Sequence, residues 1–458
     1  MLITNSEYLR PEIMDVLRMF GCEEENFTHY FSFSDGKFFN SIEYLDNFYD
    51  FENKFKVEDD ITYRRYAKRF AKLAFYKVLS NVKGVNFSWG ALTGIRPTKL
   101  AYSEINEGRD FKNLFGEMCV SEENGELVGK ILEVQKDIYL KKGGQDLFIS
   151  IPFCPTKCEY CSFITAPIAA TEKYVDGYLN CLVKEIESVK QIVKRLNSIY
   201  IGGGTPFVLT APQLEKVLKA VRQNFSQSVE FTVEAGRPDV FSEEKLSLCK
   251  EYGVTRICVN PQTFNDETLI KIGRKHTCKQ TLEAYEMTKK FPFDINLDLI
   301  AGLADETVGD FCNSLNNAVK LNPENITVHT LSLKSGAKLK ENTKRLDVCG
   351  IGDMIKKSRE TLTGSGYKPY YLYRQKYQAG GLENTGWCKS KPCVYNVNVM
   401  EEISDNVAVG ANAISKKLFD GGERIERLAS PKDIPTYINK ADSIIADRIK
   451  LFSNGENL

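Results

Sequence analysis

Short apolar segments alternate with longer amphipathic segments between residues 147 and 330. The apolar segments have the length of buried strands, and the amphipathic segments repeat their apolar residues every three or four positions, as helices do. The predicted strands are Leu147–Ile151, Ser198–Ile201, Glu230–Val233, Arg256–Val259, Ile295–Ile300 and Ile326–His329. The predicted helices are Lys173–Lys194, Pro212–Asn224, Glu243–Glu251, Cys278–Lys290 and Val308–Lys320. This alternation predicts an α/β fold of six parallel βα units, a partial (β/α)6 barrel over residues 146–335.

The region before the barrel has a different pattern. Residues 1–145 contain aromatic-rich alternating segments with a hairpin signal at Asp35-Gly36, and a helix near Tyr63–Leu79. They predict an N-terminal α+β accessory domain. On the helix, the expected apolar stripe is Tyr66, Phe70, Leu73 and Phe75, and the expected solvated face is Arg64, Arg65, Lys68, Arg69 and Lys72.

The region after the barrel, residues 336–458, predicts a C-terminal α+β extension. Helices are expected near Ile351–Leu362 and Pro431–Asp447, with strands at Lys368–Arg374 and Val394–Met400 between them.

Composition narrows the range of functions. The chain has 61 basic and 61 acidic residues, so it offers no general attraction for polyanions, and no nucleic-acid partner is expected. Its 13 cysteines show no disulfide pattern, and it has neither a signal peptide nor an apolar run of membrane-spanning length. These features predict a cytoplasmic protein without a membrane partner.

Three of the cysteines are closely spaced directly after the first predicted strand. Cys154, Cys158 and Cys161 lie in Ser150-Ile-Pro-Phe-Cys-Pro-Thr-Lys-Cys-Glu-Tyr-Cys-Ser-Phe163. Three thiolates can hold three irons of a cubane cluster and leave the fourth iron open to a ligand. The alternatives are a zinc site completed by a distant fourth residue, or loop cysteines without a metal.

The C-x3-C-x2-C spacing after Ile-Pro-Phe resembles the signature of the radical S-adenosylmethionine superfamily. The resemblance implies that Cys154, Cys158 and Cys161 bind a 4Fe–4S cluster whose open iron chelates S-adenosylmethionine. One electron from the cluster would then cleave S-adenosylmethionine to a 5′-deoxyadenosyl radical. The resemblance also implies that Tyr160 lies against the adenine.

Distinctive residues also lie at the ends of the other predicted strands, where barrel active sites are assembled. Gly202-Gly-Gly-Thr-Pro206 follows the second strand, Glu234 the third and Gln262 the fourth, while Asp298 and His329 end the fifth and sixth. Each polar residue could instead form a structural ion pair. The resemblance assigns S-adenosylmethionine binding to Tyr160, Gly203, Gly204, Thr205, Glu234, Gln262, Arg274 and Asp298, and names no catalytic residue.

Further segments resemble the HemZ branch, the oxygen-independent coproporphyrinogen III oxidase-like proteins also called coproporphyrinogen dehydrogenases. They are Asn260-Pro-Gln-Thr-Phe264, Ile272-Gly-Arg-Lys-His276, Val328-His-Thr-Leu-Ser-Leu333, Tyr370-Tyr-Leu-Tyr-Arg-Gln375 and Leu382-Glu-Asn384. The resemblance implies oxidative decarboxylation of tetrapyrrole propionates to vinyl groups in haem biosynthesis. It also implies an electron donor such as flavodoxin or ferredoxin. Two other interpretations stay open: a haem-binding, chaperone-like relative without decarboxylase activity, and a radical enzyme that acts on another substrate.

The chain departs from the HemN branch in three places. HemN has Tyr-x-His before Pro-Phe-Cys, where this chain has Phe148 and Ser150. HemN has a further cysteine two residues after the third, where this chain has Phe163, and Asn412 replaces a usual glycine. The cations that we expect to bind substrate carboxylates are Arg374, Lys376, Lys389 and Lys391.

Overall fold

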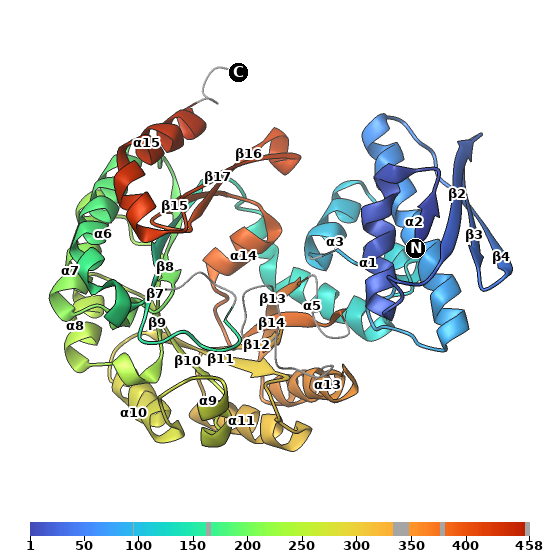
Figure 1. Ribbon diagram of the computed structural model, residues 1–458. Coiled ribbons are helices and arrows are strands. Elements are labelled where there is room, and N and C mark those ends of the chain that lie inside the picture. The colour runs from blue at the N-terminus through green and yellow to red at the C-terminus, as the bar shows by residue number, and fades with distance from the viewer. Residues whose placement is uncertain (95, 162–165, 333–347, 376–380, 454–458) are drawn as a thin grey trace. The chain divides into compact units, whose positions relative to one another are not determined.

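The computed structural model describes residues 1–94, 96–161, 166–332, 348–375 and 381–453 (Figure 1). Lys376 therefore lies outside the described residues. The chain divides into two compact units, Met1–Gly129 with Arg374–Leu382, and Lys130–Tyr373 with Glu383–Leu458. These units differ from the expected three-part division, because the regions on both sides of residue 335 belong to the same unit.

The N-terminal unit is a four-stranded sheet covered by helices. The sheet order is β1-β2-β3-β4, in which β1 pairs parallel to β2 and the other pairs are antiparallel. Asp35 and Gly36 both have positive φ and form the predicted hairpin turn between β2 and β3. The elements are β1 (Leu2–Thr4), α1 (Arg10–Phe20), β2 (Phe27–Ser34), β3 (Lys37–Tyr44), β4 (Asn47–Lys54), α2 (Asp60–Lys83), α3 (Pro97–Asn106), α4 (Phe111–Glu117) and the start of α5 (Glu122–Tyr139).

Helix α2 buries the predicted apolar stripe, but its basic face is not uniformly solvated. Arg69 was expected in solvent, and this expectation is wrong: only 7% of the residue is exposed, and its guanidinium donates to Glu104 at 3.0 Å. Lys72 is half-buried, it donates to Thr93 Oγ1 at 3.3 Å, and desolvation lowers its pKa to about 8. The physical reason is that α3 lies along this side of α2 and supplies Glu104.

The second unit contains all six predicted parallel strands of the barrel. They pair side by side in the order β5-β8-β9-β10-β11-β12. Figure 1 shows the helices that connect them arranged around the outside of the curved sheet. The strands are β5 (Gln145–Ile151), β8 (Leu196–Gly203), β9 (Glu230–Gly236), β10 (Arg256–Gln262), β11 (Asp294–Ala301) and β12 (Asn325–Thr330). The helices are α6 (Ile168–Val189), α7 (Ala211–Asn224), α8 (Glu243–Glu251), α9 (Asp266–Lys271), α10 (Cys278–Lys289) and α11 (Val308–Leu321).

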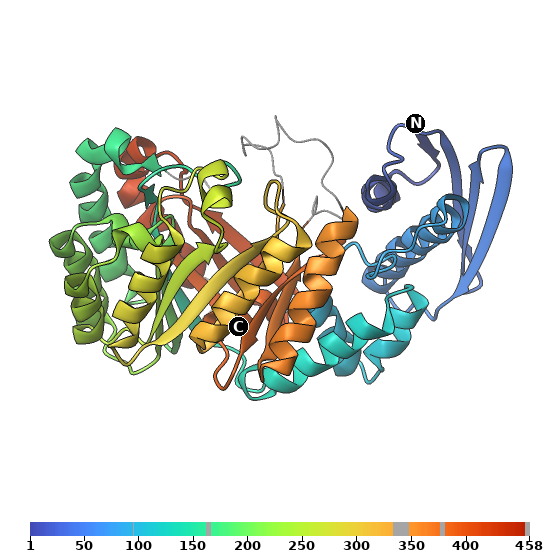
Figure 2. The ribbon, with the colours of Figure 1, turned by 90° about the horizontal axis from the view of Figure 1, so that it is seen from below.

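The C-terminal region extends this same sheet at both edges. β15 (Asp405–Val409) pairs parallel to β5, followed by β16 (Ile414–Phe419) and β17 (Arg424–Ala429). At the other edge, β14 (Glu383–Cys388) pairs antiparallel to β12, and β13 (Lys368–Arg374) lies next to β14. The predicted helices are α13 (Val348–Gly364), which packs beside α11 (Figure 2), and α15 (Ile434–Ser453).

The prediction of a strand at Val394–Met400 is wrong, because Val394–Glu401 forms helix α14. Alternating valines favour a strand, but the helix begins beside the Glu230 carboxylate. This carboxylate accepts hydrogen bonds from the backbone N–H groups of Val394 at 3.0 Å and Tyr395 at 3.1 Å. A carboxylate on the first N–H groups of a helix stabilises that helix, so tertiary contacts override the local preference.

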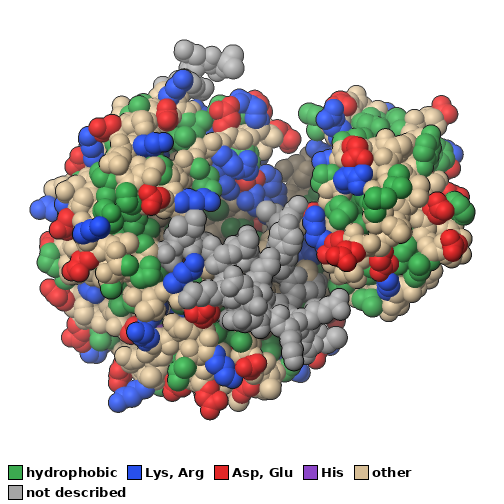
Figure 3. All heavy atoms as spheres, in the orientation of Figure 1, with side chains coloured by type: hydrophobic (Ala, Val, Ile, Leu, Met, Phe, Trp, Pro, Cys, Tyr) green, Lys and Arg blue, Asp and Glu red, His purple; other side chains and the backbone are tan. Residues whose placement is uncertain are grey.

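The surface of the protein carries charges of both signs. Acidic and basic side chains both occur across the described part of the face shown in Figure 3. Within the described residues, no helix is both long and apolar enough to cross a bilayer.

Candidate functional site

The cysteine loop leaves β5 and is tied to the segments that follow β8 and β10. The backbone N–H of Gly204 donates to Ile151 at 2.7 Å, and that of Thr205 to Phe153 at 2.8 Å. Farther along the loop, the N–H of Glu159 donates to Ile272 at 3.0 Å. Backbone hydrogen bonds to the end of β8 and to the residue that follows α9 therefore hold the loop across the C-terminal end of the barrel.

Cys154 lies at the glycine run that follows β8. It is 9% exposed, and the Thr205 hydroxyl donates to its Sγ at 3.4 Å. A Cβ on Gly204 would lie 3.0 Å from that sulfur and 2.5 Å from the Phe153 carbonyl oxygen. Gly203 has a φ of 104°, which favours glycine. The absence of side chains at these two positions lets the β8 backbone approach the sulfur.

Arg274 lies between the second half of the cysteine loop and the end of β10. Its Nη1 donates to the carbonyls of Asn260 and, at 3.4 Å, Pro261. Burial opposes its charge, yet the neighbouring Tyr160 and Cys158 raise its pKa. Its Nε has no hydrogen-bond partner within the described part of the chain. The guanidinium therefore contacts the loop and keeps one donor for a further group.

Tyr160 and Gln262 present different chemistry. Burial raises the pKa of Tyr160, and its ring packs against a buried apolar cluster of Leu269, Ile272, Ile300, Leu303 and Leu331. Gln262, the last residue of β10, has a φ of 71°. Among the described residues its buried Oε1 has no partner. The site thus offers an aromatic ring and an open amide acceptor.

Two carboxylates face each other inside the barrel. Burial and the charge of Asp298 raise the pKa of Glu234 to about 7, although Tyr200 and His329 act in the opposite direction. The Tyr200 hydroxyl donates to Glu234. The His329 imidazole lies 3.8 Å from Asp298 through Nε2 and 3.3 Å from the Tyr373 hydroxyl through Nδ1. These five side chains form a polar cluster, which we call the interior cluster.

The structure therefore places most of the predicted residues in three groups. Cys154, Gly203, Gly204 and Thr205 meet at the first half of the loop, and Cys158, Tyr160 and Arg274 meet at the second. Glu234 and Asp298 belong to the interior cluster. Asp298 was expected at the end of its strand but lies deeper, before Leu299, Ile300 and Ala301.

Tyr200 and Tyr373 belong to the site but were not among the predicted residues. Tyr200 lies two positions before Gly202, so the two share a face of β8, and the alternation of faces along a strand could have indicated Tyr200. Tyr373 ends a stretch of alternating tyrosines in β13, but its neighbour His329 lies far away in the sequence. Such a pair is visible only once the sheet order is known.

Three of the cations expected to bind substrate carboxylates are among the described residues. Arg374 belongs to the N-terminal unit, where it is 6% exposed and donates to the carbonyls of Leu92 and Gly381. Lys389 donates to Asn322, before β12 begins, and Lys391 is exposed nearby. The two lysines lie at the end of the sheet opposite to the cysteine loop, so the expectation for them is wrong, whereas that for Arg374 stays a prediction.

The chemistry of the cysteine loop fits an iron–sulfur cluster. Among the described residues, no three His, Cys, Asp or Glu side chains are close enough to hold a metal ion. Thiol groups are drawn together by the metal that they bind, because metal bonds supply the energy that gathers them. Three cysteines, a hydroxyl donating to one sulfur and a glycine that clears space beside it form a suitable donor set. The open Arg274 Nε and Gln262 Oε1 suit a polar cosubstrate.

Comparison with known proteins identifies relatives over most of the chain. A family model described as the radical SAM superfamily matches residues 148–318. The chain is 35% identical to the oxygen-independent coproporphyrinogen-III oxidase-like protein HemZ of Bacillus subtilis, over 84% of this chain and 80% of HemZ. It is 29% identical to the haem chaperone HemW of Buchnera aphidicola, over 64% of this chain and 75% of HemW.

A solved structure has the same fold. Coproporphyrinogen III oxidase HemN of Escherichia coli, described as a radical SAM enzyme, matches with a TM-score of 0.54 and 22% identity. The match covers 67% of this chain and 71% of HemN, and it confirms the predicted α/β barrel fold. The chain therefore belongs to the radical S-adenosylmethionine superfamily, with a 4Fe–4S cluster and S-adenosylmethionine as its cofactors, and within it to the family of the oxygen-independent coproporphyrinogen-III oxidase-like protein HemZ.

Proposed function

We propose that this protein oxidatively decarboxylates propionate groups of coproporphyrinogen III to vinyl groups. The observation that carries the proposal is the likeness to HemZ, which extends over 84% of the chain. The reaction removes a β-hydrogen atom from the propionate, after which carbon dioxide leaves and one electron passes to an external acceptor. When bound, the cluster and S-adenosylmethionine supply the 5′-deoxyadenosyl radical that abstracts this hydrogen atom.

In this proposal Cys154, Cys158 and Cys161 hold the cluster, and flavodoxin or ferredoxin supplies its electron. Thr205 orients Cys154 by donating a hydrogen bond to its sulfur. Arg274 plays the corresponding part at the second half of the loop, where it contacts Cys158 and Tyr160. The loop is thereby fixed at both ends before any ligand binds.

S-adenosylmethionine is held by polar groups from four neighbouring strand ends. The backbone at Gly203 and Gly204 receives its methionine part, and the Nε of Arg274 has a donor left for the carboxylate. Glu234 and Asp298 accept hydrogen bonds from its amine or ribose hydroxyls. Tyr160 lies against the adenine, and Gln262 offers its open acceptor.

The interior cluster supplies the groups that face the substrate. Phe148 and Ser150 replace the tyrosine and histidine of the HemN pattern. Tyr373 and His329 bring a phenol and an imidazole into the barrel from other strands, 3.3 Å apart. We propose that this pair donates hydrogen bonds to a substrate carboxylate.

The likeness to HemW makes a haem chaperone the second candidate. A haem carrier needs an axial ligand, and His329 is the histidine inside the barrel. Its two ring nitrogens already have Asp298 and Tyr373 as neighbours.

One anaerobic incubation separates the two functions. Reconstituted protein with S-adenosylmethionine, reductant and coproporphyrinogen III should release 5′-deoxyadenosine and form a tricarboxylic intermediate. Cys158→Ala should lose the iron–sulfur absorption band and both products, whereas Cys312→Ala, a half-buried cysteine on α11, should retain them. Stoichiometric haem binding without any decarboxylated product would establish the chaperone instead.

A further inference from the structure

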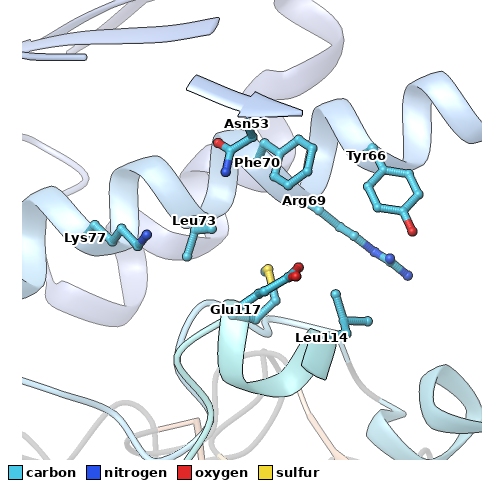
Figure 4. A pocket seen from close by; sticks show the side chains of 9 residues that line it. Asn53, Tyr66, Arg69, Phe70, Leu73, Lys77, Leu114 and Glu117 are labelled. Atoms are coloured by element: carbon cyan, nitrogen blue, oxygen red, sulfur yellow. The ribbon is translucent and has the colours of Figure 1, made fainter. Parts of the chain in front are cut away.

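The N-terminal unit contains a cavity that is separate from the barrel. Its volume is about 120 Å³, and it lies between α2, α4 and the end of β4 (Figure 4). The lining residues are Asn53, Tyr66, Arg69, Phe70, Leu73, Lys77, Leu114, Glu117 and Met118. All of them belong to the same compact unit. An apolar cavity of roughly 150 Å³ holds benzene, so this volume accepts a ligand group of about that size.

Arg69, one of the residues that line the cavity, has an unused hydrogen-bond donor. It is 7% exposed, and its Nη2 pairs with Glu104 at 3.0 Å. Its Nη1 is buried and has no hydrogen-bond partner among the residues described. Leaving a buried donor on a charged group without a hydrogen bond is energetically costly. A bound acceptor would remove this cost.

Opposite charges line two different walls. Arg69 and Lys77 extend from α2, and Glu117 extends from α4 (Figure 4). Lys77 and Glu117 are exposed, so they form the mouth of the cavity. A simple anion would meet the Glu117 carboxylate, and a simple cation would meet Arg69 and Lys77.

Between these charges the floor is apolar. Phe70, Leu73, Leu114 and Met118 are buried hydrophobic side chains that line the cavity. They suit a short aliphatic group of up to about four carbons, which is smaller than benzene. The cavity thus combines a cationic wall, an anionic wall and a small apolar floor.

We propose that this cavity binds a small zwitterion, an α-amino acid with an aliphatic side chain. The carboxylate accepts a hydrogen bond from Arg69, Lys77 attracts it from the mouth of the cavity, the ammonium group donates to Glu117, and the side chain lies on the apolar floor. This proposal does not depend on the proposed decarboxylase function, because no residue of the barrel takes part.

The test compares three ligands that differ in one charge each. Isothermal titration of the full-length, cluster-loaded protein under anaerobic conditions should detect L-leucine binding. 4-Methylpentanoate lacks the ammonium group and 3-methylbutylamine lacks the carboxylate, so each should bind at least about tenfold more weakly. Equal affinity for L-leucine and either analogue would overturn the assignment of a zwitterion.

Two exposed positions allow the charges to be removed without disturbing the fold. Lys77→Met and Glu117→Gln should each weaken L-leucine binding about tenfold or more. Lys112→Met and Glu123→Gln are matched controls at exposed positions outside the cavity, and both should bind as the unmodified protein does. Unchanged affinity in the first pair, or no detectable binding of L-leucine, valine or alanine, would overturn the proposal. Leu73→Phe, which fills the cavity, should abolish binding while the iron content stays constant.

Discussion

Replacing Gly204 by alanine is the sharpest test of the cysteine loop, because the added methyl group meets backbone atoms that cannot rotate away. Its Cβ would lie 2.5 Å from the Phe153 oxygen, 2.9 Å from the Ile151 oxygen and 3.0 Å from the Cys154 sulfur. Real Cβ atoms essentially never approach other atoms to within 3.0 Å, so the loop must move by several tenths of an ångström. Overpacking of this kind costs about 1–3 kcal/mol.

We expect three measurable consequences of Gly204→Ala. The free energy of unfolding, measured in urea, should fall by about 1–3 kcal/mol. Iron and sulfide bound per chain should fall as well, since Cys154 is displaced from the other two thiols. The affinity for S-adenosylmethionine should fall by about tenfold or more, because small misplacements at reacting groups have large effects.

The control is Gly177→Ala in helix α6. There the nearest atom to the new Cβ is Ile438 Cδ1 at 3.6 Å, an ordinary contact. A glycine replaced by alanine inside a helix should raise stability by about 0.5–1 kcal/mol and leave iron content unchanged. If Gly204→Ala retained the iron content and cosubstrate affinity of the unmodified protein, the loop could not be the cluster site.

Three further predictions follow from buried polar groups. Because the pKa of Glu234 is about 7, its charged form increases as pH rises from 6 to 8, and S-adenosylmethionine affinity should rise with it. Tyr200→Phe removes a hydrogen bond that lowers this pKa, so the midpoint of the binding-against-pH curve should move to higher pH; an unmoved midpoint would contradict the assignment. Arg448→Met leaves the buried Glu185 unpaired and should lower the free energy of unfolding by about 3–5 kcal/mol, with partial recovery when Glu185→Gln is added; urea titrations without that recovery would argue against the ion pair. Asn412→Gly should change thermal stability little or raise it by up to about 1 kcal/mol, because Asn412 has a φ of 59° that favours glycine; a large loss would show that its side chain matters.

The barrel strands were predictable because each one is a short apolar run in a buried parallel sheet. Strands β9 and β10 begin at the predicted residues and run only a few residues longer. The extra residues include three polar ones, Glu234, Asn260 and Gln262, which continue the strands into the site. A polar residue after an apolar run predicts the end of a strand. In β9 and β10 the strand instead continues through these polar residues, which belong to the site.

The helix at Val394–Glu401 and the burial of Arg69 were not predictable from the local sequence pattern. Helix α14 has the valine alternation of a strand. Its first backbone N–H groups donate to Glu230, which is more than 160 residues away in the sequence. Arg69 on α2 has the spacing of a solvated residue, and its burial depends on Glu104 of another helix. In both cases a single long-range carboxylate decides the outcome.

The glycine and cysteine motifs were predictable because each consists of residues that are close together in the sequence. The residues of the interior cluster are far apart in the sequence, so no local pattern predicts that they meet. Thr205 and Cys154 meet because β5 and β8 are adjacent, which the βα alternation already implies. Tyr373 reaches His329 through β14, a strand that runs antiparallel to β12 and that no periodicity signalled.

The last third of the chain also supports the strand that leads into the cysteine loop. Gly410 follows β15 with a φ of 96°, and a Cβ there would lie 2.7 Å from the Ser150 oxygen. Its N–H donates to Glu185 at 2.6 Å, and that carboxylate pairs with Arg448 of α15. Ser150 is four residues before Cys154, so the position of the first cysteine depends on contacts made by residues 405–448. A segment ending at residue 335 would keep all three cysteines and the glycine run, yet it would lose the strand paired with β5 and the helix that neutralises Glu185. The cluster loop is therefore a property of the whole second unit rather than of the barrel alone.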